Sequence, residues 1–225
     1  MALDLRNCDC MELMKQFPDK YFDLAIVDPP YGIGADKAQN NAAEQRIKAK
    51  GKSKAGRGWK KYRETDWDSD IPKAEYFFEL ERVSKNQIVW GGNYFFQLWQ
   101  TPCKGFIIWD KGQRDFSLAD CELAWTSFDK CARIVDISRG EALAENNNTG
   151  GRIHPTQKPV ALYKWLLNKY GVEGDKILDT HLGSGSIAIA CHDYKFDLVG
   201  SEIDSGYYKD LIKRVQNHVA QQSLF

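Results

Sequence analysis

The chain has 225 residues, of which 43% are hydrophobic and 28% charged. These values are typical of a globular protein and exclude a fibrous or wholly disordered chain. The length predicts a single domain, residues 1–225, with a sizeable insertion. The longest uncharged stretch, residues 86–103, contains amides and glycines, so we expect no membrane span. Because the first residues lack the pattern of a secretory signal, we expect a cytoplasmic protein.

The formal net charge is zero, from 31 basic and 31 acidic residues, which by itself argues against a nucleic-acid partner. The distribution is uneven, however, because residues 46–63 contain no acid and many bases. These bases are Arg46, Lys48, Lys50, Lys52, Lys54, Arg57, Lys60, Lys61 and Arg63. Such a run is either a solvated face or a surface that binds a polyanion.

The chain has 6 cysteines and none forms a C-x-x-C pair. Most of them lie in apolar segments, which predicts reduced thiols used as small core residues. We therefore expect neither structural disulfides nor a metal site.

The hydrophobic pattern predicts an α/β fold. An apolar strand at residues 22–27 ends at Asp28-Pro29-Pro30, because proline cannot continue a central strand. Further strands are expected at residues 87–90, 105–109, 121–126, 133–137, 176–179 and 197–202, and helices at 73–84, 159–170, 186–194 and 206–221. The alternation near the C-terminus indicates a parallel sheet with helices on both faces, and the strands between 105 and 137 are spaced for antiparallel hairpins. Residues 34–69 and 138–153 have loop composition.

Residues 178–186 combine a strand end, a glycine turn and a helix start, and the next strand ends at Glu202. Glycines allow the backbone to approach a ligand, and an acid about 20 residues further on can accept hydrogen bonds from ribose hydroxyls. The segment therefore predicts a nucleoside-binding corner. The spacing of Gly183, Gly185 and Ala188 also fits NAD or FAD, and a plain tight turn is the other alternative.

Asp28-Pro29-Pro30-Tyr31 is the more specific motif. Methylation of an exocyclic amine needs a carboxylate and a carbonyl to accept the amine hydrogens, a rigid backbone, and an aromatic ring to stack on the base. The four residues supply these groups, so we predict that Asp28, Pro29, Pro30 and Tyr31 are catalytic. The alternative is a strand terminator followed by a core tyrosine.

With these motifs the chain resembles the N6-adenine/N4-cytosine DNA methyltransferases of the permuted β arrangement, and in particular stand-alone phage or prophage enzymes of bacteria. The resemblance extends to residues 7–12, 79–83, 90–94, 154–159, 200–204 and 207–208. It implies a circularly permuted, Rossmann-like class I methyltransferase with a mostly parallel seven-stranded sheet and an antiparallel edge hairpin. One departure is that Thr180-His181 stands where the family usually has Pro-Phe, and His181 is expected to pack as a neutral ring.

The resemblance implies S-adenosyl-L-methionine as cofactor. The expected cofactor-binding residues are Asp9, Cys10, Asp28, Thr156, Lys158, Asp179, His181, Gly183, Ser184, Gly185, Ser186, Glu202 and Ile203. Lys158 is expected to meet either the cofactor carboxylate or a DNA phosphate. No metal takes part.

The implied reaction is methylation of the N6 amine of adenine in duplex DNA with a flipped target base, since an initial Asp favours adenine where Ser is usual for cytosine enzymes. Lys48, Lys50, Lys52, Lys54, Arg57, Lys60, Lys61 and Arg63 are the expected DNA-binding residues, and segment 138–153 is a candidate for target recognition. The alternatives are N4-cytosine methylation, an RNA or protein methyltransferase, a non-catalytic DNA-binding protein and a nucleotide-dependent oxidoreductase. We expect a monomer or a homodimer.

Overall fold

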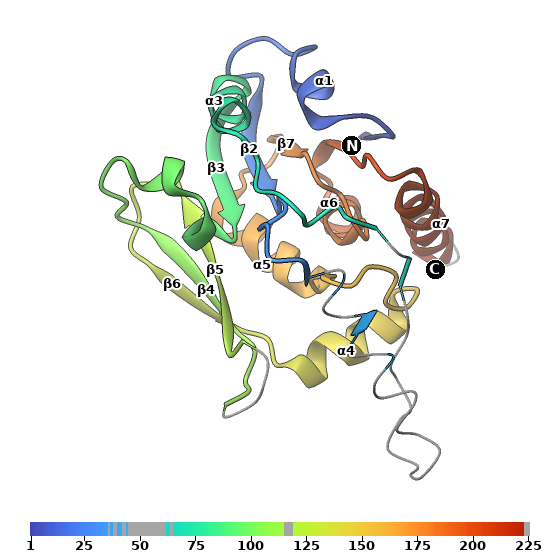
Figure 1. Cartoon of the computed structure of the whole chain (residues 1–225). Coiled ribbons are helices and arrows are strands. Elements are labelled where there is room, and N and C mark those ends of the chain that lie inside the picture. The colour runs from blue at the N-terminus through green and yellow to red at the C-terminus, as the bar shows by residue number, and fades with distance from the viewer. Residues whose placement is uncertain are drawn as a thin grey trace.

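The computed structural model describes residues 1–35, 37, 40–41, 44, 62–63, 65–114 and 119–222 (Figure 1). One sheet carries the fold, in the strand order β1-β8-β7-β2-β3-β5-β4-β6. The strands are β1 (Leu3–Arg6), β2 (Phe22–Val27), β3 (Ser84–Trp90), β4 (Phe106–Asp110), β5 (Cys121–Thr126), β6 (Arg133–Asp136), β7 (Lys176–Asp179) and β8 (Asp197–Ser201). Within these ranges, none of the helices has the length and apolar character of a membrane span.

The predicted α/β fold with a mostly parallel sheet is confirmed. The pairs β1/β8, β8/β7, β7/β2 and β2/β3 are parallel, and β5 is antiparallel to both β3 and β4. Two details differ from the expectation. The sheet has 8 strands rather than seven, because the short segment β1 pairs with β8. The β4–β5 hairpin is not at the edge, because β6 pairs parallel with β4 outside it.

The helices lie on both faces of the sheet. They are α1 (Cys10–Met14), α3 (Ala74–Val83), α4 (Arg139–Asn148), α5 (Val160–Tyr170), α6 (Ser186–Tyr194) and α7 (Ser205–Gln222), with the short 3-10 helices η3 (Gly92–Tyr94) and η4 (Phe96–Trp99). Leu24 and Ile26 of β2 pack in one core with α5 and α6, whereas Ala25 and Val27 pack in a second core with α1 and α3. This alternation of side chains along a strand buries both faces of the sheet.

Segment 138–153 is not the expected loop, since most of it forms α4. Ser138 and Glu141 make a capping box, which satisfies the free backbone N–H groups at the start of the helix. Glu145 Oε1 also accepts the backbone N–H of Ala161 at 2.8 Å, which ties α4 to the start of α5. Three consecutive asparagines at the end of the helix gave the segment its loop composition.

All 6 cysteines are free thiols. The expectation that most serve as core residues holds in part, because Cys191 is fully buried and Cys8 and Cys10 pack half-buried against the second core. Cys121, at the start of β5, and Cys131, before β6, are exposed.

Candidate active site

The two predicted motifs meet at one edge of the sheet. Strands β2 and β7 are parallel neighbours, with Ala25 opposite Leu178, so the segments that follow them leave the sheet side by side. A cavity of about 1330 Å³ opens there. Of the predicted site residues it is lined by Asp28, Pro29, Pro30, Tyr31, Thr156, Lys158, His181, Gly183, Ser184, Glu202 and Ile203.

Five predicted cofactor residues do not line this cavity: Asp9, Cys10, Asp179, Gly185 and Ser186. Asp9 accepts the backbone N–H groups of Met11 and Glu12 and so caps α1. Burial raises the pKa of the Cys10 thiol, next to that cap, to about 12. Gly185 caps α6 with a left-handed φ of 71°, and Ser186 is the first residue of that helix. The predicted roles of these five residues in cofactor binding are therefore not supported by the cavity lining.

Asp28 forms the centre of the site. Its Oδ2 accepts a hydrogen bond from Lys158 Nζ at 2.5 Å, and its Oδ1 accepts one from the Tyr31 hydroxyl at 2.5 Å. Burial raises the pKa of Asp28, and the Lys158 ammonium opposes that rise. Burial lowers the pKa of Lys158, but the carboxylates of Asp28 and Glu122 raise it above its ordinary value overall, so the proton stays on the lysine.

Glu122 and Lys111 extend this pair and were missed from the sequence. Glu122 Oε2 lies 3.2 Å from Lys158 Nζ, and its Oε1 lies 2.6 Å from Lys111 Nζ. Burial raises the pKa of Glu122, but the two lysines lower it to about 2 overall. The result is a chain of alternating acidic and basic side chains from Asp28 to Lys111. The available signal was an acid inside the otherwise apolar strand β5.

The Tyr31 ring is fixed by neighbours that follow β3. Tyr94 stacks on it with 5.0 Å between ring centroids and 14° between planes. Gly91 has a left-handed φ of 68°, and a Cβ there would lie 2.1 Å from the Tyr31 ring. Only glycine permits this close approach of backbone to ring.

Asp68 holds the backbone that follows the catalytic motif, and it too was missed. Its carboxylate accepts the backbone N–H groups of Tyr31 at 2.6 Å, Gly32 at 2.9 Å and Ala35 at 2.7 Å. The side chain is buried, with 1% exposed. Three charge-assisted hydrogen bonds from one carboxylate fix the loop that carries Tyr31. Nothing in the composition of segment 34–69 distinguished this acid from a surface residue.

The glycine turn lines the same cavity as Asp28. Glu202 Oε2 accepts the backbone N–H of Gly183 at 2.9 Å, and its Oε1 accepts that of Asp204 at 2.9 Å. Burial raises the pKa of Glu202 to about 7, against the effect of these hydrogen bonds. Arg214 Nη1 donates to the carbonyl oxygen of Ser184 at 2.8 Å, which holds the turn from behind.

Thr180 and His181, the departure from the usual family pattern, form a hydrogen-bonded set with Tyr76. The Tyr76 hydroxyl lies 2.6 Å from Thr180 Oγ1, which lies 2.9 Å from His181 Nδ1. Burial lowers the pKa of His181 to about 4, so its ring is neutral at neutral pH, as expected. Asp179, just before, accepts the backbone N–H of His181 at 2.9 Å, and burial raises its pKa to about 8.

His154 adds a second neutral imidazole to the cavity wall and was not predicted as a site residue. Burial lowers its pKa to about 3. Its ring lies 4.5 Å from Tyr207 and 5.1 Å from Trp67, measured between centroids, and Gly183 also lies against it. The wall beside the glycine turn is therefore aromatic.

Most of the predicted DNA-binding residues lie outside the described residues: Lys48, Lys50, Lys52, Lys54, Arg57, Lys60 and Lys61. Arg63 is described. Its Nη2 pairs with Asp210 of α7 at 2.9 Å, and its guanidinium lies over the Tyr207 ring at 5.8 Å from the centroid. This pairing places the end of the basic segment beside the cavity wall.

Comparison with known proteins assigns the family. The DNA methylase family model N6_N4_Mtase matches residues 60–214, which is more than half of the chain. The chain belongs to this DNA methylase family. The matched region includes Lys158, Gly183 and Glu202, whereas Asp28 to Tyr31 precede it.

Other relatives agree with this DNA methylase assignment. Type II methyltransferase M.HpaI of Haemophilus parainfluenzae is 33% identical over 70 residues, which is 31% of this chain and only 22% of that protein. The M1.HpyAVI-SAM complex has a TM-score of 0.59 at 17% identity and covers 95% of this chain and 98% of that one. The cytosine-N4-specific PvuII DNA methyltransferase has a TM-score of 0.59 at 13% identity and covers 98% and 91%. At these identities the two structures establish the shared fold.

Proposed function

We propose that this DNA methylase transfers a methyl group from S-adenosyl-L-methionine to the N6 amine of adenine in duplex DNA. The observation that carries the proposal is that Asp28 and Tyr31 share one cavity with the glycine turn and Glu202. One side of the cavity then has the groups for an exocyclic amine, and the other has those for a nucleoside. The methyl-donor complex of the structural relative M1.HpyAVI supports this choice of cofactor.

The cofactor half of the cavity fits a nucleoside with a charged tail. Gly183 has a left-handed φ of 51°, and because it has no side chain a ligand can approach the backbone of the turn closely. Glu202 is the acid at the end of the next strand and suits two ribose hydroxyls. The cofactor would supply an electrophilic methyl group on a sulfonium, and the residues of this chain would orient it toward Asp28.

The amine half of the cavity activates the target. The lone pair of the amine is delocalised into the purine ring, so the nitrogen becomes nucleophilic when its hydrogens are accepted by fixed oxygens. Asp28, which is paired with Lys158 Nζ at 2.5 Å, accepts one hydrogen, and the Pro29 carbonyl oxygen is proposed to accept the other. Fixed charges and positioning supply most of the rate enhancement in such a site, and the amine proton leaves toward Asp28 after transfer.

Tyr94 determines how a flipped base can reach Tyr31. A centroid distance of 5.0 Å between the two rings leaves no room for a base between them. The base therefore either displaces Tyr94 or stacks on the opposite face of Tyr31. Base–aromatic stacking is worth about 1–3 kcal/mol, which offsets part of the cost of flipping the base.

The decisive experiment incubates the purified protein with labelled cofactor and duplex DNA and identifies the methylated nucleoside by mass spectrometry. N6-methyladenine supports the proposal, N4-methylcytosine identifies the competing activity, and methylation of RNA or protein alone overturns the DNA substrate. Asp28→Ala is expected to abolish transfer with at most a modest loss of cofactor binding by calorimetry. Equal activity in that variant would show that the amine site is wrongly placed.

A further inference from the structure

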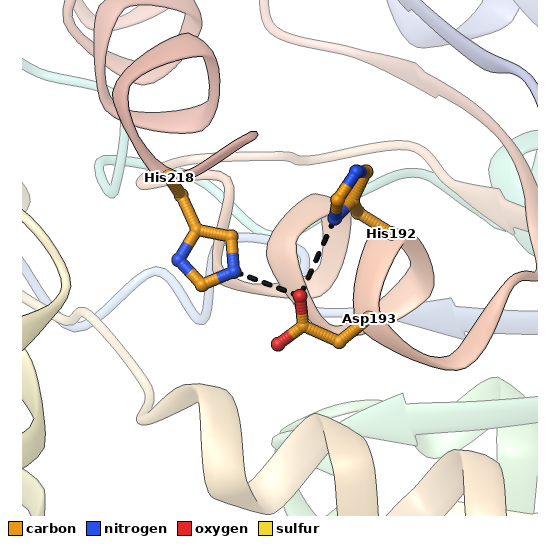
Figure 2. Close-up of side chains that lie close together, drawn as sticks. All are labelled: His192, Asp193 and His218. Carbon is orange, nitrogen blue, oxygen red and sulfur yellow. Dashed lines mark hydrogen bonds and ion pairs between the residues drawn. The ribbon is translucent and has the colours of Figure 1, made fainter. Parts of the chain in front are cut away.

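A second group of ligand-type side chains lies outside the methylase cavity, where α6 packs against α7 (Figure 2). His192 and Asp193 are on α6, and His218 is on α7. His218 Nε2 lies 2.7 Å from Asp193 Oδ1, and His192 Nδ1 lies 3.4 Å from the same oxygen. Both imidazole rings therefore direct a nitrogen at one carboxylate oxygen from two different helices.

The geometry suits a small divalent ion. One ligand atom from each of the three residues lies within 4.8 Å of the other two. In a tetrahedral zinc site with bonds of about 2.0–2.2 Å, neighbouring ligand atoms are about 3.3 Å apart. The distance from His192 Nδ1 to Asp193 Oδ1 already has this value. The distance from His218 Nε2 to Asp193 Oδ1 must increase by about half an ångström, which a small rotation of the His218 ring allows.

The two oxygens of the Asp193 carboxylate have different neighbours. Oδ1 lies against the two imidazole rings. Lys164 Nζ binds the other oxygen, Oδ2, at 2.6 Å. This contact orients the carboxylate so that Oδ1 faces the two rings, although the lysine charge also opposes a bound cation.

The three side chains are mostly buried but keep some exposure to solvent. The side chains of Asp193, His192 and His218 are 7%, 12% and 15% exposed. An ion can therefore enter from one side and keep water as a further ligand, while most of the coordination sphere is protein.

We propose that His192, Asp193 and His218 form a binding site for a divalent transition-metal ion of the zinc class, which fastens the C-terminal half of α7 onto α6. Imidazole and carboxylate are the ligands that such ions take in proteins. The three residues do not line the methylase cavity, so the role is structural and independent of methyl transfer. The sequence predicted no metal site because the ligands come from positions 192–193 and 218 without a recognisable spacing.

The test titrates zinc chloride, and separately cobalt chloride, into the protein after treatment with a chelator. Exposed thiols such as those of Cys121 and Cys131 can also take up such ions, so the parent for this experiment carries C121S and C131S. We expect one equivalent of metal by calorimetry, a tetrahedral cobalt absorption spectrum without thiolate bands, and a higher Tm with zinc. No saturable binding, or binding with no change of Tm, would overturn the site.

Variants locate the metal. Asp193→Asn and His218→Gln should each weaken zinc binding at least about tenfold. His192→Gln, which removes the longest contact, serves if either of these fails to fold by circular dichroism. Lys164→Gln is the matched control: it removes the competing cation but keeps a side-chain N–H donor for Asp193 Oδ2, so a metal site retains or gains affinity. Unchanged affinity in the ligand variants would show that the cluster is only a hydrogen-bonded clasp.

Discussion

Replacing Lys158 by methionine tests the buried charge chain of the methylase site. The substitution keeps an unbranched side chain but removes the ammonium that lies 2.5 Å from Asp28 and 3.2 Å from Glu122. The Lys158 side chain is only 2% exposed, while those of Asp28 and Glu122 are 18% and 27% exposed. Removing one partner of a buried ion pair costs about 3–5 kcal/mol, and the partial exposure of the acids places this variant near the lower end. We expect a loss of about 3 kcal/mol in the free energy of unfolding at pH 8.

The loss should depend on pH. Without Lys158, burial raises the pKa of at least one of the two carboxyls in the folded state, while the unfolded chain keeps the ordinary value. Between these two values the folded variant binds a proton that the unfolded chain releases. The stability of the variant relative to the parent therefore falls as pH rises, by at most about 1.4 kcal/mol per pH unit and proton. The deficit should be smaller at pH 5 than at pH 8.

Urea unfolding followed by circular dichroism at both pH values measures this deficit. Lys164→Met is the matched control, because Lys164 of α5 pairs with Asp193 at 2.6 Å but is 32% exposed. Its loss should stay below about 1 kcal/mol. Adding Glu122→Gln to Lys158→Met should recover part of the stability but no methyl transfer, since Asp28 still lacks its partner. The reasoning fails if Lys158→Met costs no more than the control at either pH.

Three further outcomes are expected. Burial raises the pKa of Asp179 to about 8, so ionisation of this carboxyl opposes folding as pH rises. Relative to the parent, Asp179→Asn should therefore be stabilised progressively as pH rises toward 8. A Tm difference from the parent that does not change with pH would contradict this. Gly91→Ala should abolish methyl transfer, because the new Cβ would clash with the Tyr31 ring. Gly174→Ala is the control and should retain methyl transfer, because Gly174 also has a left-handed φ but no atom lies within 4 Å of a Cβ built there. Equal rates in the two variants would exclude the clash. Glu202→Ala should weaken cofactor binding, measured by calorimetry, at least about tenfold, because loss of a charged hydrogen-bond partner costs about 1.5–3 kcal/mol. Undiminished affinity would show that Glu202 does not bind the ribose.

The sequence by itself determined the parts of this methylase that depend on local chemistry. An apolar strand stopped by Pro29 and Pro30, and a glycine turn at Gly183 and Gly185, are set by backbone restrictions that act within a few residues. Because neighbouring parallel strands end at one edge of a sheet, the two motifs come together, and Pro29, Pro30 and Gly183 line one cavity. Hydrophobic periodicity predicted the α/β fold, and the family motifs added the prediction of a DNA methyltransferase.

Tertiary contacts determined the secondary structure of segments whose local sequence signals were weak. Segment β1 is a strand only because β8 offers it a partner, and α4 is a helix only because a capping box and the contact of Glu145 with α5 offset poor propensity. The edge pairing of β6 likewise follows from its neighbour β4.

Buried charges were the least predictable feature. Asp68 looks like a surface acid in the sequence, and Glu122 is marked only by its place inside the mostly apolar strand β5, because composition does not show which distant groups will contact an acid. In the fold, Asp68 receives three backbone N–H groups, and Glu122 lies between two lysines. Burial of a charge is tolerated only when its partners are in place, and those partners come from elements far apart in the chain.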